Sequence, residues 1–231
     1  MNNIDYQHLT LGEIVAQDFR TATLFKQAGI DFCCGGKKTL QQACSEKEID
    51  ASILIHELTV LEQDPQNHAH NFKDWDLGFL SDYIVNTHHK YVLKMLPELV
   101  FYTQKIAQAH GEHHPELVEV AELFNKINTE LLQHLKNEED VLFPAIKQAI
   151  TAHSTDTKKV IESEIHRMNG EHEFAGGAMD KINQITKGYK LPNDACNTYS
   201  VTFKLLEQFE DDLHIHVHLE NNILFPKALK L

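Results

Sequence analysis

Residues 134–144 read HLKNEEDVLFP, and residues 216–226 read HVHLENNILFP. Both segments follow the pattern H-x-x-x-E-x-x-[VI]-L-F-P, so one motif occurs twice, 82 residues apart. A residue and the fourth residue after it lie one turn apart on the same face of an α-helix. Each copy therefore predicts a helix that presents a histidine and a glutamate together, and the repeat predicts two related helical hairpins.

The histidine and glutamate of each copy lie within an apolar helical stripe. Burying two carboxylates without compensation would be very costly, and neither stripe contains a lysine or an arginine. A bound cation is the natural compensation. The plainer alternative is a solvated helix face with chance His/Glu pairs, and the repetition in two apolar stripes counts against it. The stripes are Leu131, His134, Leu135, Glu138 and Leu142 in the first copy, and Leu213, His216, Val217, Glu220 and Leu224 in the second.

Two further histidines occupy matching positions on other predicted helices. His172 lies in an apolar stripe 44 residues before His216. The equivalent residue before His134 is His88 or His89; both lie in stripes that could be buried, so periodicity alone leaves the choice open. His89 precedes His134 by 45 residues, the nearer match, and we favour it. The predicted ligand set is His89, His134, Glu138, His172, His216 and Glu220, which fits two ions of iron, manganese or zinc.

The rest of the chain has the pattern of an all-α protein. Helical periodicity dominates, and no stretch shows sustained period-two alternation. Long amphipathic helices are predicted over about 76–109, 115–151, 157–187 and 194–230. The breaks between them are short and contain glycine, proline, serine and threonine, and such short loops favour antiparallel neighbours. The prediction is an up-down four-helix bundle.

The first part of the chain predicts a small, separate helical domain that bears cysteines. Its patterning indicates short helices, the first of them ending at Gly29. A polar stretch that contains Pro65 and has little periodicity follows, and we interpret it as a linker. The predicted domains are therefore 1–61 for the small domain, 62–74 for the linker and 75–231 for the bundle.

Cys33 and Cys34 are adjacent. A disulfide between them would be strained, because neighbouring Cα atoms are only about 3.8 Å apart. The two glycines that follow would keep the backbone accessible. The next two lysines and a helix N-terminus would lower a thiol pKa. We predict a reactive, catalytic thiol pair, with burial in a small core as the alternative. Cys44 and Cys196 are expected to be small apolar fillers.

Composition excludes several classes of function. The chain has 34 acidic and 21 basic residues and a net charge of −13, which argues against nucleic-acid binding. Its sequence contains no apolar run that could span a bilayer and no signal peptide pattern, so we expect a cytoplasmic protein without membrane partners. It also has 16 histidines, of which four are assigned to metal. His214 and His218, two residues on either side of His216, are expected to face solvent.

Five motifs in order along the chain carry a resemblance to a known family. Together they resemble the hemerythrin-like (HHE) family, and more closely the RIC (repair of iron centres) or ScdA-type iron-sulfur cluster repair proteins within it. The resemblance covers nearly the whole chain. The motifs are DFCCGGKKTL (31–40), THHKYVLKMLPEL (87–99), HLKNEEDVLFPAIK (134–147), GEHEFAG (170–176) and HVHLENNILFPKAL (216–229).

The resemblance implies a metal centre of a particular kind. It implies two iron ions per chain, bridged by an oxo group and by carboxylates. The family's ligands map onto the same six residues, with the second of the paired histidines, His89, as the ligand. Glu138 and Glu220 are then the bridging carboxylates, and Cys33 and Cys34 are the functional cysteine pair.

The resemblance also implies a function. Members of the family are linked to the repair of iron-sulfur clusters damaged by nitrosative or oxidative stress, through iron donation, nitric oxide removal or both. Damaged iron-sulfur proteins would be the partners, and nitric oxide or dioxygen the small ligand. The alternatives are a nitric-oxide-reducing enzyme and a dioxygen-binding or dioxygen-sensing protein. The sequence leaves a homodimer open.

Overall fold

The computed structural model describes residues 5–62, 72–152 and 155–231. Most of the linker predicted at 62–74 lies outside these residues. The described part of the chain contains α-helices, 3-10 and π-turns and one isolated β-bridge, but no strand, which confirms the all-α prediction. It contains no helix with the length and apolar character that crossing a bilayer requires.

The chain divides into two compact units. One unit comprises Met1–Leu80 together with Val217–Lys230, and the other comprises Ser81–His216 and the final residue. The last helical turns of the chain thus belong to the same unit as the cysteine-bearing segment.

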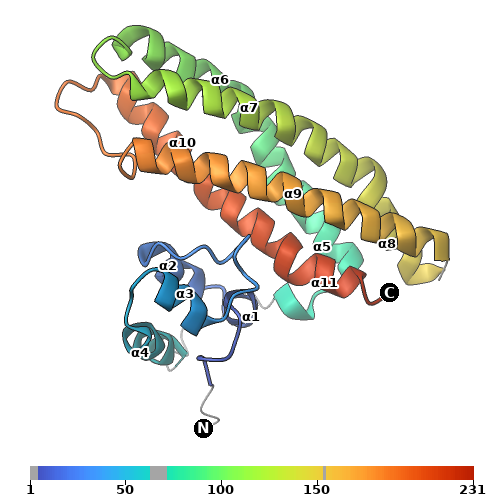
Figure 1. Cartoon of the computed structure of the whole chain (residues 1–231). Coiled ribbons are helices and arrows are strands. Elements are labelled where there is room, and N and C mark those ends of the chain that lie inside the picture. The colour runs from blue at the N-terminus through green and yellow to red at the C-terminus, as the bar shows by residue number, and fades with distance from the viewer. Residues whose placement is uncertain (1–4, 63–71, 153–154) are drawn as a thin grey trace. The chain divides into compact units, whose positions relative to one another are not determined.

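The second unit consists of long helices with apolar faces, and Figure 1 shows α6, α7, α9 and α10 running alongside one another. In α7, buried side chains recur every three or four residues, as an amphipathic helix requires. Phe124 of α7 meets Phe209 of α10 edge to face, with ring centroids 5.3 Å apart. Burying each such side chain stabilises the fold by about 1.5–3 kcal/mol. The helices are α6 (Lys90–His110), α7 (Glu116–Asn137), α8 (Phe143–Thr151), α9 (Thr155–Ile185) and α10 (Asn197–Leu219).

Three of the predicted long helices are interrupted by π-turns: η2 (Val85–His89), η3 (Glu138–Leu142) and η4 (Glu220–Leu224). In each, the residue after the π-turn donates its backbone N–H to a carbonyl five residues back. Both copies of the sequence motif have the same local structure. The glutamate begins the π-turn, the leucine ends it, and Phe-Pro starts a new α-helix. Proline is tolerated in the first turn of an α-helix, where its missing N–H costs no hydrogen bond, and the proline of each motif lies in that turn.

The first unit is built from short helices. Thr10 and Thr39 each begin a helix with a capping box, in which the threonine side chain and the residue three positions later satisfy each other's backbone N–H groups. The helix that we predicted to end at Gly29 is divided at Asp18. Gly29 has φ +65 and follows the end of α2, in agreement with its predicted role. The helices are α1 (Leu11–Gln17), α2 (Thr21–Gln27), α3 (Leu40–Glu46), α4 (Ala51–Glu62), η1 (Phe72–Asp74) and α11 (Phe225–Ala228); α5 (Leu77–Ile84) starts in this unit and ends in the other.

Asn222, within η4, holds the cysteine-bearing loop. Its Nδ2 donates to the carbonyl oxygens of Phe32 at 3.2 Å and Cys33 at 3.1 Å. Gly12 and Gly36 pack against the same side chain. A Cβ on Gly12 would lie 2.6 Å from Asn222 Oδ1, and one on Gly36 would lie closer still. These two glycines therefore form a socket for Asn222.

We expect Gly36→Ala to destabilise the protein by about 1–3 kcal/mol, because the added methyl group overlaps Asn222. Urea unfolding measures this loss. Gly177→Ala is the matched control: no neighbouring atom lies within 4 Å of its Cβ position, and alanine favours a helix interior by about 0.5–1 kcal/mol. If Gly36→Ala lowered the free energy of unfolding equally in an Asn222→Ala background, the overlap with Asn222 would not be the cause of the destabilisation.

Candidate metal centre

Glu138 is a fully buried carboxylate at the first position of η3. Its Oε2 lies 3.4 Å from Nε2 of His89 and 3.3 Å from Nε2 of His134. Potential ligand atoms of His89, Glu138 and His216 lie within 4.8 Å of one another, and so do those of His134, Glu138 and His172. Glu138 thus belongs to two groups of potential metal ligands.

The π-turns coincide with these groups. His89 is the last residue of η2, and Glu138 and Glu220 are the first residues of η3 and η4. Glu220 is also fully buried, and it follows His216 by four residues along one helical backbone. His172 lies within α9, where it is 2% exposed. π-turns within α-helices are frequent at functional sites, and these bear predicted ligand positions.

Two further carboxylates fix the orientation of the histidine rings. Nδ1 of His134 lies 2.7 Å from Glu171 Oε2, and Nδ1 of His89 lies 2.9 Å from Glu139 Oε1. Because a carboxylate accepts, each Nδ1 carries the proton and each Nε2 directs its lone pair toward Glu138. The hydrogen bond to His134 is the main cause that lowers the pKa of Glu171. Carboxylates in this position typically orient metal-bound histidines.

The structure places His89, and not His88, in the group with Glu138. Both histidines are buried. Nδ1 of His88 donates to Asp212 Oδ1 at 2.9 Å, and the His88 ring stacks on that of His216 with centroids 5.7 Å apart. This placement supports His89, while its role as a metal ligand stays a prediction.

Comparison with known proteins identifies the family. Residues 81–228 match the hemerythrin HHE cation binding domain. The chain belongs to the hemerythrin HHE family. Residues 7–62 match ScdA_N, a domain of unknown function (DUF542). The chain is 34% identical over 230 residues to the iron-sulfur cluster repair protein YtfE of Yersinia pestis (strain Pestoides F), and equally to that of Yersinia pseudotuberculosis serotype O:1b (strain IP 31758). The match covers 98% of this chain and 99% of each relative.

The expected resemblance and the hemerythrin-like bundle are thus confirmed. An HHE domain binds metal cations, and the buried groups around Glu138 provide the imidazole and carboxylate donors that such binding requires. The sequence did not reveal the roles of Glu139 and Glu171. In the sequence, Glu139 and Glu171 stand out only because they are next to Glu138 and His172. Neighbouring side chains on a helix point about 100° apart, so this adjacency does not predict that they contact the histidine ligands.

His218 in this HHE protein does not face solvent as expected. It is fully buried, and the centroid of its ring lies 6.2 Å from that of Phe19 and 5.8 Å from that of Phe32. Burial lowers its pKa to about 4. The periodicity of the helix that carries His218 gives no sign of Phe19 and Phe32, which belong to the same unit as His218 and pack against its ring. His214 is half-buried rather than exposed.

The cysteine pair is organised around Asp31. Its Oδ1 accepts from the Cys33 backbone N–H at 2.9 Å, the Cys34 N–H at 3.0 Å and the Cys33 thiol at 3.1 Å. Cys33 is buried and Cys34 is half-buried. Hydrogen bonding with Cys34, then burial and Asp31, raise the pKa of the Cys33 thiol. The predicted lowering of a thiol pKa is therefore wrong for Cys33. One of the lysines expected to cause it, Lys38, pairs instead with Glu46.

The other two cysteines differ from each other. Cys44 is 1% exposed, as expected of an apolar filler. Cys196 is exposed just before α10, so the filler prediction is wrong for it. The backbone N–H of Tyr199, and then His110 with Nε2 3.2 Å from the sulfur, lower the pKa of Cys196. Its environment depends on a loop and a second helix that periodicity does not reveal.

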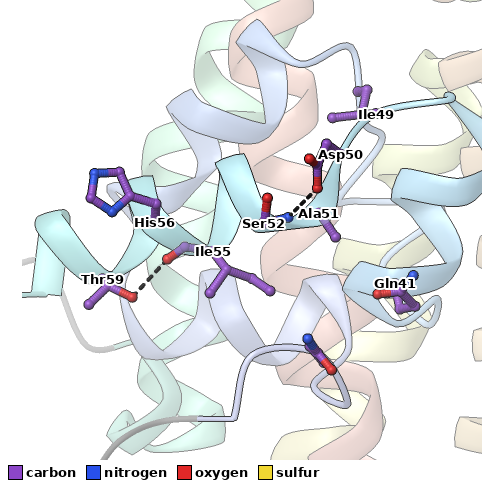
Figure 2. Close-up of a pocket in the computed structure, with 9 residues that line it drawn as sticks. Gln41, Ile49, Asp50, Ala51, Ser52, Ile55, His56 and Thr59 are labelled. Atoms are coloured by element: carbon purple, nitrogen blue, oxygen red, sulfur yellow. Dashed lines mark hydrogen bonds between the residues drawn. The ribbon is translucent and has the colours of Figure 1, made fainter.

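A pocket of about 710 Å³ in the first unit offers no comparable metal site. Figure 2 shows Asp50 directed toward Ser52, whose backbone N–H it accepts at 2.9 Å, while His56 projects elsewhere. Among the described residues, neither Asp50 nor His56 belongs to a group of three or more potential metal ligands. The lining residues are Gln7, Gln41, Ile49, Asp50, Ala51, Ser52, Ile55, His56 and Thr59.

We expect Glu171→Gln to weaken metal binding by roughly 10–100-fold, because an amide holds the His134 ring less firmly than a carboxylate does. Competition with a chelator of known affinity measures the change. Glu173→Gln, on an exposed part of the same helix, is the control and should bind metal as the wild type does. Equal affinities for both variants would argue against the role of Glu171.

We expect iodoacetamide to modify Cys196 at lower pH than Cys33. The lowered pKa of Cys196 increases its thiolate fraction near neutral pH, whereas the raised pKa of Cys33 keeps that thiol protonated until the pH is higher. Alkylation rates of individual peptides, followed by mass spectrometry across a pH series, give both profiles. His110→Gln should shift the Cys196 profile to higher pH. Faster alkylation of Cys33 than of Cys196 at neutral pH would contradict the assignment.

Proposed function

We propose that this chain is a di-iron protein that repairs iron-sulfur clusters damaged by nitrosative or oxidative stress. The observation that carries the proposal is the buried Glu138 carboxylate, which two groups of potential ligands share. The family match and the names of the relatives, iron-sulfur cluster repair proteins, support iron as the metal and cluster repair as the function. None of the four cysteines, which all lie in the described part of the chain, forms a disulfide, and this supports action in the reducing cytoplasm.

In this proposal, His89 and His216 would hold one iron ion, His134 and His172 would hold the other, and Glu138 would be a ligand shared by both. Convergence of these imidazoles on one buried carboxylate fits such a pair. We assign Glu220 as the second bridging ligand. It is fully buried, it begins a π-turn as Glu138 does, and it follows His216 by one helical turn.

When bound, the two iron ions supply a redox-active pair from which iron, or a coordination position for a small ligand, is available. The protein residues prepare the site for them. Glu171 and Glu139 keep the protons of His134 and His89 at Nδ1, which leaves each Nε2 as a donor. Burial of Glu138 excludes bulk water, so the negative charge of its carboxylate strongly favours a cation.

We further propose that the cysteine pair acts on the client protein. Cys34 is the more accessible thiol, and Cys33 is held next to it by hydrogen bonds to Asp31. Thiolates are good iron ligands, so the pair could accept iron on its way to a damaged cluster. This division assigns iron storage to the bundle and delivery to the cysteines.

The test is reactivation of an iron-sulfur enzyme previously inactivated with nitric oxide. We expect the double variant Cys33→Ala/Cys34→Ala to lose reactivation while it retains nearly two iron ions per chain. Cys196→Ala, which removes the exposed thiol at α10, is the control and should retain both. Loss of iron from the double variant would contradict the division between bundle and cysteines.

The same reactivation assay distinguishes cluster repair from the alternative functions. Glu138→Gln should lose iron and reactivation together, because it alters a ligand common to both groups. Consumption of nitric oxide over many turnovers, without any reactivation, would favour a nitric-oxide-reducing enzyme. A stable and reversible oxygenated spectrum without reactivation would favour a dioxygen carrier or sensor.

A further inference from the structure

Glu210 of α10 is a second buried carboxylate, outside the groups around Glu138. It is 3% exposed, and Asn183 Nδ2 donates to its Oε2 at 3.0 Å. Within residues 5–62, 72–152 and 155–231, no lysine or arginine lies within ion-pair distance of it. Burial is the main cause that raises its pKa. A carboxylate buried in this way is stabilised by a nearby positive charge.

Two other potential metal ligands converge on Glu210. His214 follows it by one turn on α10, and Asp180 lies on α9. Potential ligand atoms of Asp180, Glu210 and His214 all lie within 4.8 Å of one another. The three side chains differ in their exposure to solvent: Glu210 is buried, His214 is half-buried and Asp180 is exposed. An ion could therefore enter from solvent and contact a buried carboxylate.

A buried phenol adds an independent observation. Tyr189 is 8% exposed, and its buried hydroxyl has no hydrogen-bond partner within 3.5 Å among the described residues. The carboxylate of Glu210 is the second cause, after burial, that raises the pKa of Tyr189, which places the phenol beside it. A buried polar group without a partner is unfavourable unless a bound species satisfies it. The hydroxyl and the three ligands thus form one polar site between α9 and α10.

This cluster is separate from the centre around Glu138. Glu210 precedes His216 by six residues and Asp180 follows His172 by eight, which correspond to about 9 Å and 12 Å along their helices. His214 is two residues from His216, so its side chain points about 200° around the helix from that of His216. The two sets of ligands consequently lie on different faces of α10.

We propose that Asp180, Glu210 and His214 bind one divalent first-row transition-metal cation, such as Fe²⁺ or Mn²⁺, in addition to the metal of the HHE centre. Two carboxylates and one imidazole, without thiolate, suit these ions. The ion neutralises Glu210 and links α9 to α10. Its open side toward solvent allows exchange. This site does not depend on the repair activity.

The test is Mn²⁺ binding by the full chain with its HHE centre filled. Mn²⁺ is a suitable probe because thiolates bind it weakly, so the Cys33–Cys34 pair does not compete for the ion. Electron paramagnetic resonance of free Mn²⁺, with iron measured in the same samples, gives the ions bound per chain. We expect the wild type to bind one more Mn²⁺ than either Glu210→Gln or His214→Gln at micromolar free ion. Any empty HHE centre takes up Mn²⁺ equally in all three proteins and leaves this difference unchanged.

A matched variant and a fold check complete the experiment. Glu207→Gln removes an exposed carboxylate from the same helix and should bind Mn²⁺ as the wild type does. Glutamine at position 210 can still accept from Asn183, so circular dichroism and the iron content should match those of the wild type. Equal Mn²⁺ binding by the wild type and Glu210→Gln would overturn the proposal. So would loss of iron, rather than of the extra Mn²⁺, from the variants.

Discussion

The buried carboxylate of Glu138 is the constraint on which the bundle depends. A carboxylate that water cannot reach requires compensation, and here imidazole nitrogens approach it at 3.3 and 3.4 Å. Those nitrogens are oriented by a second layer of carboxylates, Glu139 and Glu171. Neutral imidazole alone does not balance a negative charge, so the arrangement favours a cation between Glu138 and the histidine rings.

The helical backbone is adapted to the same constraint. η2, η3 and η4 interrupt otherwise regular helices where His89, Glu138 and Glu220 occur. A π-turn widens the helix locally and loses some of its regular hydrogen bonding. The Leu-Phe-Pro ends of the repeated motif mark where the α-helix resumes. The repeat therefore encodes a backbone irregularity as well as a pair of side chains.

The cysteines show how packing determines reactivity. Asn222 holds the backbone at Phe32 and Cys33, and Asp31 accepts hydrogen bonds from the following residues. Cys33 is consequently buried beside a carboxylate, which disfavours its thiolate. Cys196, before α10, has the opposite environment. The same type of side chain thus has its pKa raised at one position and lowered at the other.

The sequence by itself determined the all-α class, the four long helices and the inward placement of His134, Glu138, His172, His216 and Glu220. These follow from helical periodicity and from the repeat, which are local properties of the chain. Only the tertiary structure placed His89, and not His88, in the group with Glu138, and only it showed the hydrogen bonds of Glu139 and Glu171 and the burial of His218. It also brought Asp180 to Glu210. Each of these depends on which side chains another helix places beside the residue, and no spacing within one helix contains that information.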